Sequence, residues 1–286
     1  MNFSMREILV TGADGQLGSD VVDELESRHM LARGTTRLNF SLENPAETRA
    51  FIEGFKPAAI VHCAAYTAVD RAESEPEKAR AVNVDGTRAV AQACAAVGAK
   101  MVYISTDYVF AGEGEEAHEI EDETAPLNVY GQTKLEGEEV VRDALDEHFI
   151  VRVSWVFGKA GKGNFVKTIL RLAGERGELA IVSDQIGSPT YTRDLAVLIA
   201  DMLQTEAYGT YQATNEGYVS WADFAREIFR QKGLDVKVTE QKTADYKTPA
   251  RRPLNSRLSK ASLDEGGFSR LPAWQDALAR YLEELE

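Results

Sequence analysis

Cysteine and long apolar runs are scarce in this chain of 286 residues, and each shortage excludes a class of protein. The two cysteines, Cys63 and Cys94, are too few for a disulfide framework and lack the spacing of metal ligands. No apolar run approaches the length that spans a bilayer. The first residues also lack the basic and apolar segments of a secretory signal. We therefore expect a cytoplasmic protein that works in a reducing compartment and spans no membrane.

Positive charge and histidine are also in short supply. The 32 lysines and arginines face 46 aspartates and glutamates, and the net charge of -14 disfavours general binding to nucleic acid or anionic membranes. The histidines show no ligand spacing and predict no metal site; they are His29, His62, His118 and His148. Two basic clusters stand out against this acidic background, at residues 159–167 and 250–257. Each cluster either collects a phosphorylated substrate or is ordinary solvated surface.

The first half of the chain alternates regularly between apolar, strand-like runs and helical stretches. The expected strands are residues 8–10, 30–32, 58–62, 101–104 and 149–153, and the expected helices are residues 15–26, 45–55, 76–97 and 128–145. Strict alternation implies right-handed crossovers and a parallel sheet covered on both faces. The sequence therefore predicts an α/β protein with a Rossmann-like, doubly wound parallel sheet.

After about residue 156 this alternation loosens. Helices are expected at residues 164–175, 194–203, 221–231 and 274–285, and short strands at 179–182 and 209–213. The pattern predicts a dinucleotide-binding domain over residues 1–156. Residues 157–286 are expected to form mainly a smaller, mixed α/β substrate-binding lobe, with some segments returning to the first domain. Ligands of open α/β sheets bind in the crevice at the carboxyl ends of the strands, which is where such a lobe would lie.

A glycine-rich turn follows the first predicted strand. Its glycines allow a tight turn and close backbone approach, while the N-terminus of the next helix offers free N–H groups to a pyrophosphate. The alternative is a tight strand-to-helix turn that binds nothing. The candidate cofactor residues in this turn are Gly12, Asp14, Gly15, Gln16, Leu17 and Gly18.

The segment after the second predicted strand bears on which cofactor is bound. A carboxylate is usual there in proteins that select NAD, because it bonds the ribose hydroxyls. Residues 31–37 contain no carboxylate but two arginines, Arg33 and Arg37. A guanidinium can pair with the 2′-phosphate of NADPH. We therefore expect NADPH to be preferred over NADH with Arg33 as a ligand, the alternative being arginines that point into solvent.

Tyr130 and Lys134 form the most informative pair in the sequence. Their spacing of four places a phenol and an ammonium on one face of a helix, where the ammonium is expected to lower the tyrosine pKa. Thr106, at the end of the fourth predicted strand, could bond a substrate carbonyl and stabilise the alkoxide formed by hydride transfer. The alternatives are a solvated helix face for the pair and a local turn for Thr106.

Several motifs together resemble the dTDP-4-dehydrorhamnose reductase family of the extended short-chain dehydrogenase/reductase superfamily. The resemblance spans essentially the whole chain. Its glycine turn and Tyr-x-x-x-Lys mark the superfamily, and the later motifs are more specific to this reductase. These motifs occupy residues 12–18, 64–70, 105–110, 128–134, 154–157, 184–190 and 251–256.

The resemblance implies reduction of the C4 ketone of dTDP-4-dehydro-β-L-rhamnose by NADPH or NADH, which gives dTDP-L-rhamnose. It implies that Tyr130 donates the proton, that Lys134 lowers its pKa and holds the nicotinamide ribose, and that Thr106 bonds the C4 oxygen. Further cofactor contacts are implied for Asn39, Phe40, Ala64, Ala65, Tyr66 and Asn83. Substrate contacts are implied for Val69, Asp107, Trp155, Asn164, Arg251, Arg252 and Asn255.

Two other functions stay open at this point. One is a related nucleotide-sugar enzyme, such as a 4-epimerase or a reductase of another 4-keto-6-deoxy sugar. The other is a non-catalytic regulatory subunit that resembles the β subunit of methionine adenosyltransferase, although an intact Thr106, Tyr130 and Lys134 argues against it. The resemblance allows a monomer or a homodimer, and some relatives dimerise through Mg²⁺. The acidic tail at residues 283–286 permits such a site but is also typical of a solvated helix end.

Overall fold

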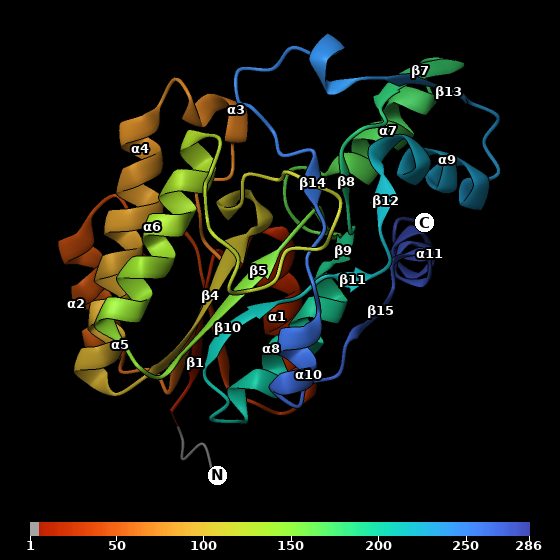
Figure 1. Ribbon diagram of the computed structural model, residues 1–286. Helices are drawn as coiled ribbons and strands as arrows, with labels where there is room; N and C mark the ends of the chain where they lie inside the picture. Colours follow the sequence, from red (N-terminus) through yellow and green to blue (C-terminus); the bar gives the residue numbers. More distant parts are fainter. Residues whose placement is uncertain (1–5) are drawn as a thin grey trace.

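The computed structural model describes residues 6–286 and is built around one parallel sheet of six strands (Figure 1). The strand order is β10-β5-β4-β3-β1-β2. The strands are β1 (Ile8–Thr11), β2 (Ala32–Thr35), β3 (Ala59–His62), β4 (Lys100–Thr106), β5 (His148–Val153) and β10 (Gly209–Gln212). All neighbours in this sheet are parallel. The order reverses at β1, so the crevice at the carboxyl ends of β1 and β3 is the expected ligand site of this doubly wound fold.

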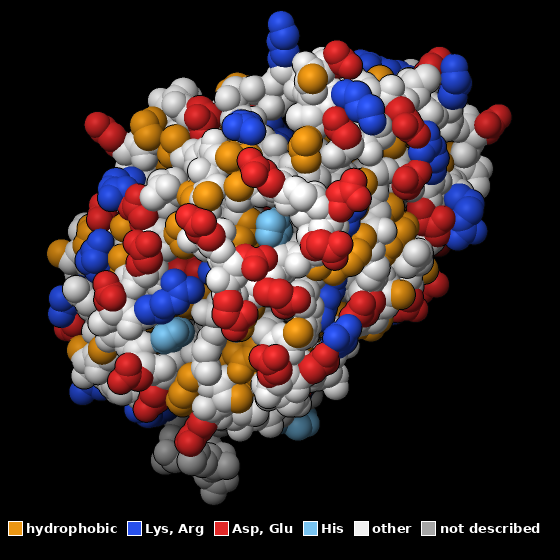
Figure 2. All heavy atoms as spheres, in the orientation of Figure 1, with side chains coloured by type: hydrophobic (Ala, Val, Ile, Leu, Met, Phe, Trp, Pro, Cys, Tyr) orange, Lys and Arg blue, Asp and Glu red, His pale blue; other side chains and the backbone are white. Residues whose placement is uncertain are grey.

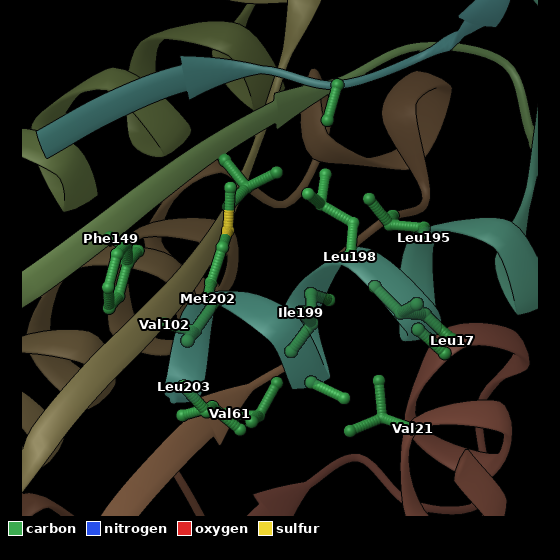
Figure 3. Close-up of a cluster of buried hydrophobic side chains, with 14 of the residues drawn as sticks. Leu17, Val21, Val61, Val102, Phe149, Leu195, Leu198, Ile199, Met202 and Leu203 are labelled. Atoms are coloured by element: carbon green, nitrogen blue, oxygen red, sulfur yellow. The ribbon is translucent and has the colours of Figure 1, made fainter. Parts of the chain in front are cut away.

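Helices cover both faces of the sheet, as the alternating sequence predicts. On one face lie α1 (Gln16–Ser27) and α8 (Thr192–Leu203); Figure 3 shows Val21 of α1 and Ile199 of α8 packed with Val61 and Val102 of the sheet. On the other face lie α2 (Pro45–Phe55), α5 (Thr87–Val97) and α6 (Val129–Ala144). Within residues 6–286, no helix is both long and apolar enough to cross a membrane.

Two elements of the first half differ from the sequence prediction. The second strand is Ala32–Thr35 rather than 30–32, because backbone pairing with Ile8–Thr11 of β1 places it and apolar content does not. The long helix expected at 76–97 contains an internal change of helix type. It begins as α4 (Pro76–Arg80), widens to a π-helical turn, η1 (Ala81–Gly86), and continues as α5. Such π-turns are frequent at functional sites, and this one carries Asn83.

A second core gathers the C-terminal helices. It contains aromatic side chains of α7 (Phe165–Ala173), α9 (Trp221–Lys232) and α11 (Trp274–Glu284). Beside it, β7 (Glu178–Val182) pairs with β13 (Lys237–Gln241). The remaining short elements are α3 (Val69–Ala72), η2 (Asp107–Val109), β6 (Val156–Phe157), β8 (Ile186–Gly187), β9 (Thr190–Tyr191), β11 (Asn215–Glu216), β12 (Val219–Ser220), η3 (Thr243–Asp245), β14 (Asn255–Ser256), α10 (Ala261–Glu265) and β15 (Leu271–Ala273).

The second half of the chain is shared between this core and the sheet. Strand β10 pairs with β5 at one edge, and α8 packs against α1 (Figure 1). The three-stranded group β12-β8-β14 lies beyond the carboxyl end of the main sheet (Figure 1). On the face shown in Figure 2, acidic side chains are intermixed with basic ones. The carboxyl end of the main sheet, where ligands of this fold bind, therefore faces the short C-terminal strands.

Candidate active site

The site begins where β4 ends and α6 starts. The side chain of Asn128 accepts a hydrogen bond from the Gly131 N–H at 2.8 Å, which caps α6 and fixes its entry beside β4. Gly131 lies so close to the Tyr108 carbonyl that a Cβ there would overlap it. This close approach sets Tyr130 and Lys134, one turn apart on α6, against the last residues of β4.

Thr106 holds the end of β4 in place with its own hydroxyl. Its Oγ1 accepts from the Tyr108 N–H at 3.2 Å and donates to Asp107 Oδ1 at 3.1 Å. The local turn considered from sequence is therefore present, yet the same hydroxyl is also near enough to the phenol of Tyr130 to lower its pKa. Burial raises the pKa of Asp107 to about 7, although hydrogen bonds from Ser256 and Thr106 oppose that rise. A buried threonine, a buried carboxyl and a phenol thus meet at one point.

The phenol of Tyr130 is held in its protonated form. Burial raises its pKa to about 12, the hydrogen bond from Thr106 opposes this rise, and the charge of Asp107 adds to it. Desolvation of the phenol outweighs every favourable contact, and the expectation that Lys134 lowers this pKa stays a prediction. The phenol of Tyr130 therefore keeps its proton near neutral pH.

Lys134 is buried under the end of β4. Its Nζ donates to the Ile104 carbonyl at 2.6 Å and sits 3.9 Å from the centre of the Tyr103 ring. Burial lowers its pKa to about 7, and the charges of Glu138 and Cys63 act in the opposite direction. The side chain is therefore fixed by the strand rather than free in solvent, and its charge is sensitive to its neighbours near neutral pH.

The glycine turn is built for close backbone approach. Gly12 has a φ of +67°, and a Cβ there would lie 2.9 Å from the Ala64 backbone. A Cβ at Gly18 would overlap the carbonyl of Gly12. Helix α1 starts at an N-cap glycine, Gly15, which brings no side chain to its first N–H groups. The residues present therefore fit the pyrophosphate of a dinucleotide at this helix end.

Several predicted cofactor residues serve to shape this end of the sheet. Asn83 is buried; its Oδ1 accepts from the Tyr66 N–H at 2.8 Å, and its Nδ2 donates to Thr133 at 3.0 Å. It thus ties the segment that follows β3, with Ala64 and Ala65, to α6. Phe40 is buried beside Phe51, at 4.9 Å between ring centres.

The predicted ligands near the cofactor phosphates are distributed differently from the sequence expectation. Arg33 lies inside β2, and its Nε is 3.2 Å from Glu7 Oε2. Arg37 follows the strand and is exposed, in a turn where Asn39 Oδ1 accepts from the Thr36 N–H at 2.9 Å. Because ligands bind at carboxyl ends of parallel strands, Arg37 has the better position for a 2′-phosphate.

Gln16 and Asn164, predicted as ligands of different molecules, contact each other. Asn164 Nδ2 donates to Gln16 Oε1 at 2.8 Å, and the same oxygen accepts from the Gly158 N–H at 2.9 Å. A Cβ at Gly161 would lie 3.2 Å from the Gln16 side chain. The basic cluster at residues 159–167 is therefore brought to the glycine turn, a placement that sequence alone left open.

Trp155 lies at the join between sheet and C-terminal lobe in an uncommon conformation. Its φ is 48°, a left-handed value that is rare for a large side chain. Its indole stacks on Trp221 with ring centres 3.5 Å apart, and a Cβ at Gly187 would lie 2.8 Å from it. Trp221 itself donates to Gln185 at 3.2 Å. Trp221 is not among the predicted site residues, and its place at a helix start was the only signal that the sequence carried for it.

Arg252 is held by a carboxylate from the first domain. Its Nη1 and Nη2 lie 3.0 and 2.8 Å from the two Asp70 oxygens, and this pairing lowers the pKa of Asp70. Val69 begins the same short helix, α3. Arg251 is exposed, and its carbonyl accepts from Asn128 at 2.8 Å. The basic cluster at 250–257 is therefore bound to α3 and to the start of α6. Asp70 is a candidate site residue that was not among the predicted ones.

Asn255 and the acidic tail have local partners. Asn255 Nδ2 donates to the Glu116 carbonyl at 2.7 Å, so its amide braces a loop. In the tail, Glu284 pairs with Arg193 at 2.5 Å and Glu286 with Lys232 at 2.7 Å. Among residues 6–286, no group of three His, Cys, Asp or Glu is arranged to hold a metal ion. Two of the three tail carboxylates considered for Mg²⁺ are thus engaged by cations of the same chain.

Comparison with known proteins decides the family. A sequence profile described as the RmlD substrate binding domain matches residues 5–286. A dTDP-4-dehydrorhamnose reductase from Sinorhizobium fredii is 40% identical over 285 residues, which cover 96% of this chain and 95% of that protein. The chain belongs to this reductase family. A crystal structure of the dTDP-4-dehydrorhamnose reductase from Bacillus anthracis in complex with NADP is 41% identical, with a TM-score of 0.94 and coverage of 98% of this chain and 99% of that one.

A relative with a different name has the same extent of similarity. The spore coat polysaccharide biosynthesis protein SpsK from Bacillus subtilis is 38% identical over 280 residues, which cover 98% of each chain. Members of the dTDP-4-dehydrorhamnose reductase family are oxidoreductases, and the Rossmann-like fold predicted from sequence is confirmed by the sheet and by these neighbours. The role of each site residue stays a prediction.

Proposed function

We propose that this reductase transfers hydride from NADPH to the C4 ketone of dTDP-4-dehydro-β-L-rhamnose and so produces dTDP-L-rhamnose. The observation that carries the proposal is the meeting of Thr106, Tyr130 and Lys134 at the carboxyl end of β4. That point lies beside the crevice formed where the strand order reverses. We propose further that residues 157–286 mainly bind the nucleotide sugar.

The chemistry divides among these three side chains. NADPH, when bound, supplies the hydride. Tyr130 donates a proton to the C4 oxygen, and its raised pKa keeps the phenol protonated until then. Thr106 donates a hydrogen bond to the same oxygen as negative charge develops on it. The Lys134 ammonium stabilises the phenolate left on Tyr130 and bonds the nicotinamide ribose.

The direct test of this function is NADPH oxidation with enzymatically prepared dTDP-4-dehydrorhamnose, followed by identification of the product. Stoichiometric oxidation with formation of dTDP-L-rhamnose is expected. A 4-epimerase would instead retain NAD⁺ through purification and show no net oxidation. A regulatory subunit would show no turnover and would associate tightly with a synthetase. Either of these results would contradict the proposed activity.

Cofactor selectivity is expected to reside in Arg37 more than in Arg33. Arg37→Ala should reduce the ratio of kcat/KM for NADPH to that for NADH by about tenfold, since one charge-assisted hydrogen bond is worth about 1.5–3 kcal/mol. Arg33→Ala is the matched control, because Arg33 is already paired with Glu7. Steady-state kinetics with both cofactors measure the ratio. A parent enzyme that uses NADH as well as NADPH would show that neither arginine reads the phosphate.

The paired Arg252 is expected to act in substrate binding. Arg252→Ala should raise KM for the nucleotide sugar by about tenfold, with kcat little changed, because a lost charge-assisted bond to the diphosphate weakens ground state and transition state alike. Asp70→Asn distinguishes binding from bracing. It frees the guanidinium, so KM should stay the same or fall if Arg252 contacts the diphosphate. If both variants raise KM equally, Arg252 only braces α3 against the C-terminal loop.

Arg251→Ala tests the other arginine of the basic cluster. An unchanged KM in both Arg251→Ala and Arg252→Ala would show that the cluster does not bind the substrate.

A further inference from the structure

Glu138 is a buried carboxylate that the proposed mechanism does not use. It lies one helical turn beyond Lys134 in α6, and its side chain has no exposed surface. Ser105 Oγ donates to it at 2.5 Å. Arg152 donates from Nε at 3.0 Å and from Nη2 at 2.8 Å, and Arg142 donates from Nη2 at 2.7 Å. An isolated buried charge would be costly, so this degree of pairing explains how the carboxylate is tolerated.

The contacts of Glu138 join the three elements that form the floor of the site. Ser105 of β4 and Arg152 of β5 lie opposite each other in the parallel pairing, and both reach the same carboxylate on α6. Ser105 is also the residue immediately before Thr106. Glu138 therefore links α6 to both β4 and β5, next to the residue Thr106 of the proposed site.

Four successive residues of β4, Tyr103 to Thr106, interact with residues of α6. The Tyr103 hydroxyl donates to the Lys134 carbonyl at 3.2 Å, and the Ile104 carbonyl accepts from Lys134 Nζ at 2.6 Å. Ser105 donates to Glu138, and Thr106 acts on the pKa of Tyr130. Gly137 permits this closeness, because a Cβ there would overlap the Tyr103 hydroxyl. A shift at Ser105 would therefore move Thr106 relative to Tyr130.

Glu138 is also the carboxylate that acts on the charge of Lys134. The groups around this ammonium are Tyr130 and Glu138, one turn to either side of it on α6, His62 and Cys63 at the end of β3, and the Tyr103 ring on β4. His62 is neutral, since burial lowers its pKa to about 3, and burial raises the pKa of Cys63 to about 12. The Arg152 and Ser105 hydrogen bonds hold the pKa of Glu138 below its usual value. It is therefore the negative charge that opposes loss of the Lys134 proton.

We propose that Glu138 is a positioning residue of the reduction, which holds Ser105 and Thr106 in register with α6 and places a carboxylate one helical turn from Lys134. The inference rests on the proposed function, because it assigns roles to Thr106, Tyr130 and Lys134. It differs from a purely structural role in what it predicts. A structural ion pair would change stability alone, whereas this one sets the pH range in which the enzyme works.

The first test is Glu138→Gln in the full chain, with Glu136→Gln as the matched control. Glu136 lies on the same helix and pairs with Arg80 and Gln132, outside this network. In Glu138→Gln the Lys134 pKa falls further, so the ammonium is lost at lower pH. We expect the alkaline limb of the kcat profile to move down by about one pH unit and kcat at pH 8 to fall about tenfold, since one pKa unit is a tenfold change in protonation. KM for the nucleotide sugar should stay within about threefold.

The second test is Ser105→Ala, which leaves the buried ion pair intact and so keeps the experiment informative if Glu138→Gln does not fold. Loss of the hydroxyl frees the end of β4, and kcat is expected to fall about tenfold with the alkaline limb unmoved. Parent-like kcat in Ser105→Ala would overturn the positioning role. A parent-like alkaline limb in folded Glu138→Gln would overturn the charge role.

A binding measurement separates this inference from the proposed function. NADPH affinity against pH, followed by cofactor fluorescence, depends on Lys134 but needs no sugar substrate. NADPH affinity should fall as the pH rises and Lys134 loses its proton. In Glu138→Gln this fall should begin at a lower pH than in the parent and in Glu136→Gln. If the parent protein fails to reduce the nucleotide sugar while this shift is seen, the substrate assignment fails and the role of Glu138 stands. The opposite pattern would mean that Glu138 is only structural.

Discussion

Replacing Tyr130 with phenylalanine is expected to lower kcat by at least about a hundredfold, the low end for loss of a general acid. The substitution removes the hydroxyl that donates the proton but keeps the ring, which packs edge-on against Tyr108 at 5.8 Å between centres. NADPH affinity should stay near that of the parent, because Lys134 is held by the Ile104 carbonyl and not by the phenol. Single-turnover hydride transfer and NADPH titration measure the two quantities separately.

The control for this variant is Tyr108→Phe. Tyr108 is the neighbouring phenol, half-buried like Tyr130, and desolvation also raises its pKa. It has no role in the proposed proton transfer, so its variant should keep kcat within a few-fold of the parent. A thermal melt confirms that both proteins are folded. Activity of Tyr130→Phe within a few-fold of the parent would remove Tyr130 from the mechanism, and equal losses in both variants would point to packing.

The fold was predictable because the sheet is specified by local patterns. In the central strands, apolar residues occupy both faces, as in Leu9 and Val10, which belong to opposite hydrophobic clusters. Helix α2 has the bounds predicted for it, and the structure shows why it starts there: Asn44 caps it and Pro45 is its first residue. The second strand was predicted at 30–32, too early in the chain, because Arg33, Gly34 and Thr35 of the observed strand do not form an apolar run. Its position comes from pairing with β1, which a local pattern does not contain.

The site was predictable in its residue types but not in its pairings. The spacing of Tyr130 and Lys134 predicted that both lie on one face of a helix, and in the structure they lie one turn apart on α6. Their electrostatics depend on burial, so the direction of the Tyr130 pKa shift could not be obtained from spacing. Asp70 and Arg252 are 182 positions apart in sequence, and Gln16 and Asn164 are 148 apart. Such contacts depend on how the C-terminal lobe packs against the first half of the chain. A short sequence motif contains no information about that packing.

Thr106→Val is expected to lower kcat by about a hundredfold, the loss typical for removal of one donor to a developing oxyanion. Valine keeps the branched shape at the end of β4 but cannot donate to the C4 oxygen. The change also removes the bond that partly offsets the raised pKa of Tyr130, so the phenol becomes a weaker acid. Both effects act on the chemical step, and KM for the nucleotide sugar should change much less than kcat.

The matched control for this prediction is Thr106→Ser, which keeps the hydroxyl and loses only the methyl group. In the structure the Thr106 hydroxyl also caps η2 by accepting from the Tyr108 N–H at 3.2 Å, and loss of such a cap costs about 1 kcal/mol of stability. Serine retains the cap and valine does not, so stability alone cannot separate the two roles. The kinetic isotope effect with deuterated NADPH can. If Thr106 acts on the oxyanion, hydride transfer becomes more rate-limiting in the valine variant, while the serine variant resembles the parent. A valine variant with parent kcat and a lowered melting temperature would leave Thr106 as a cap alone.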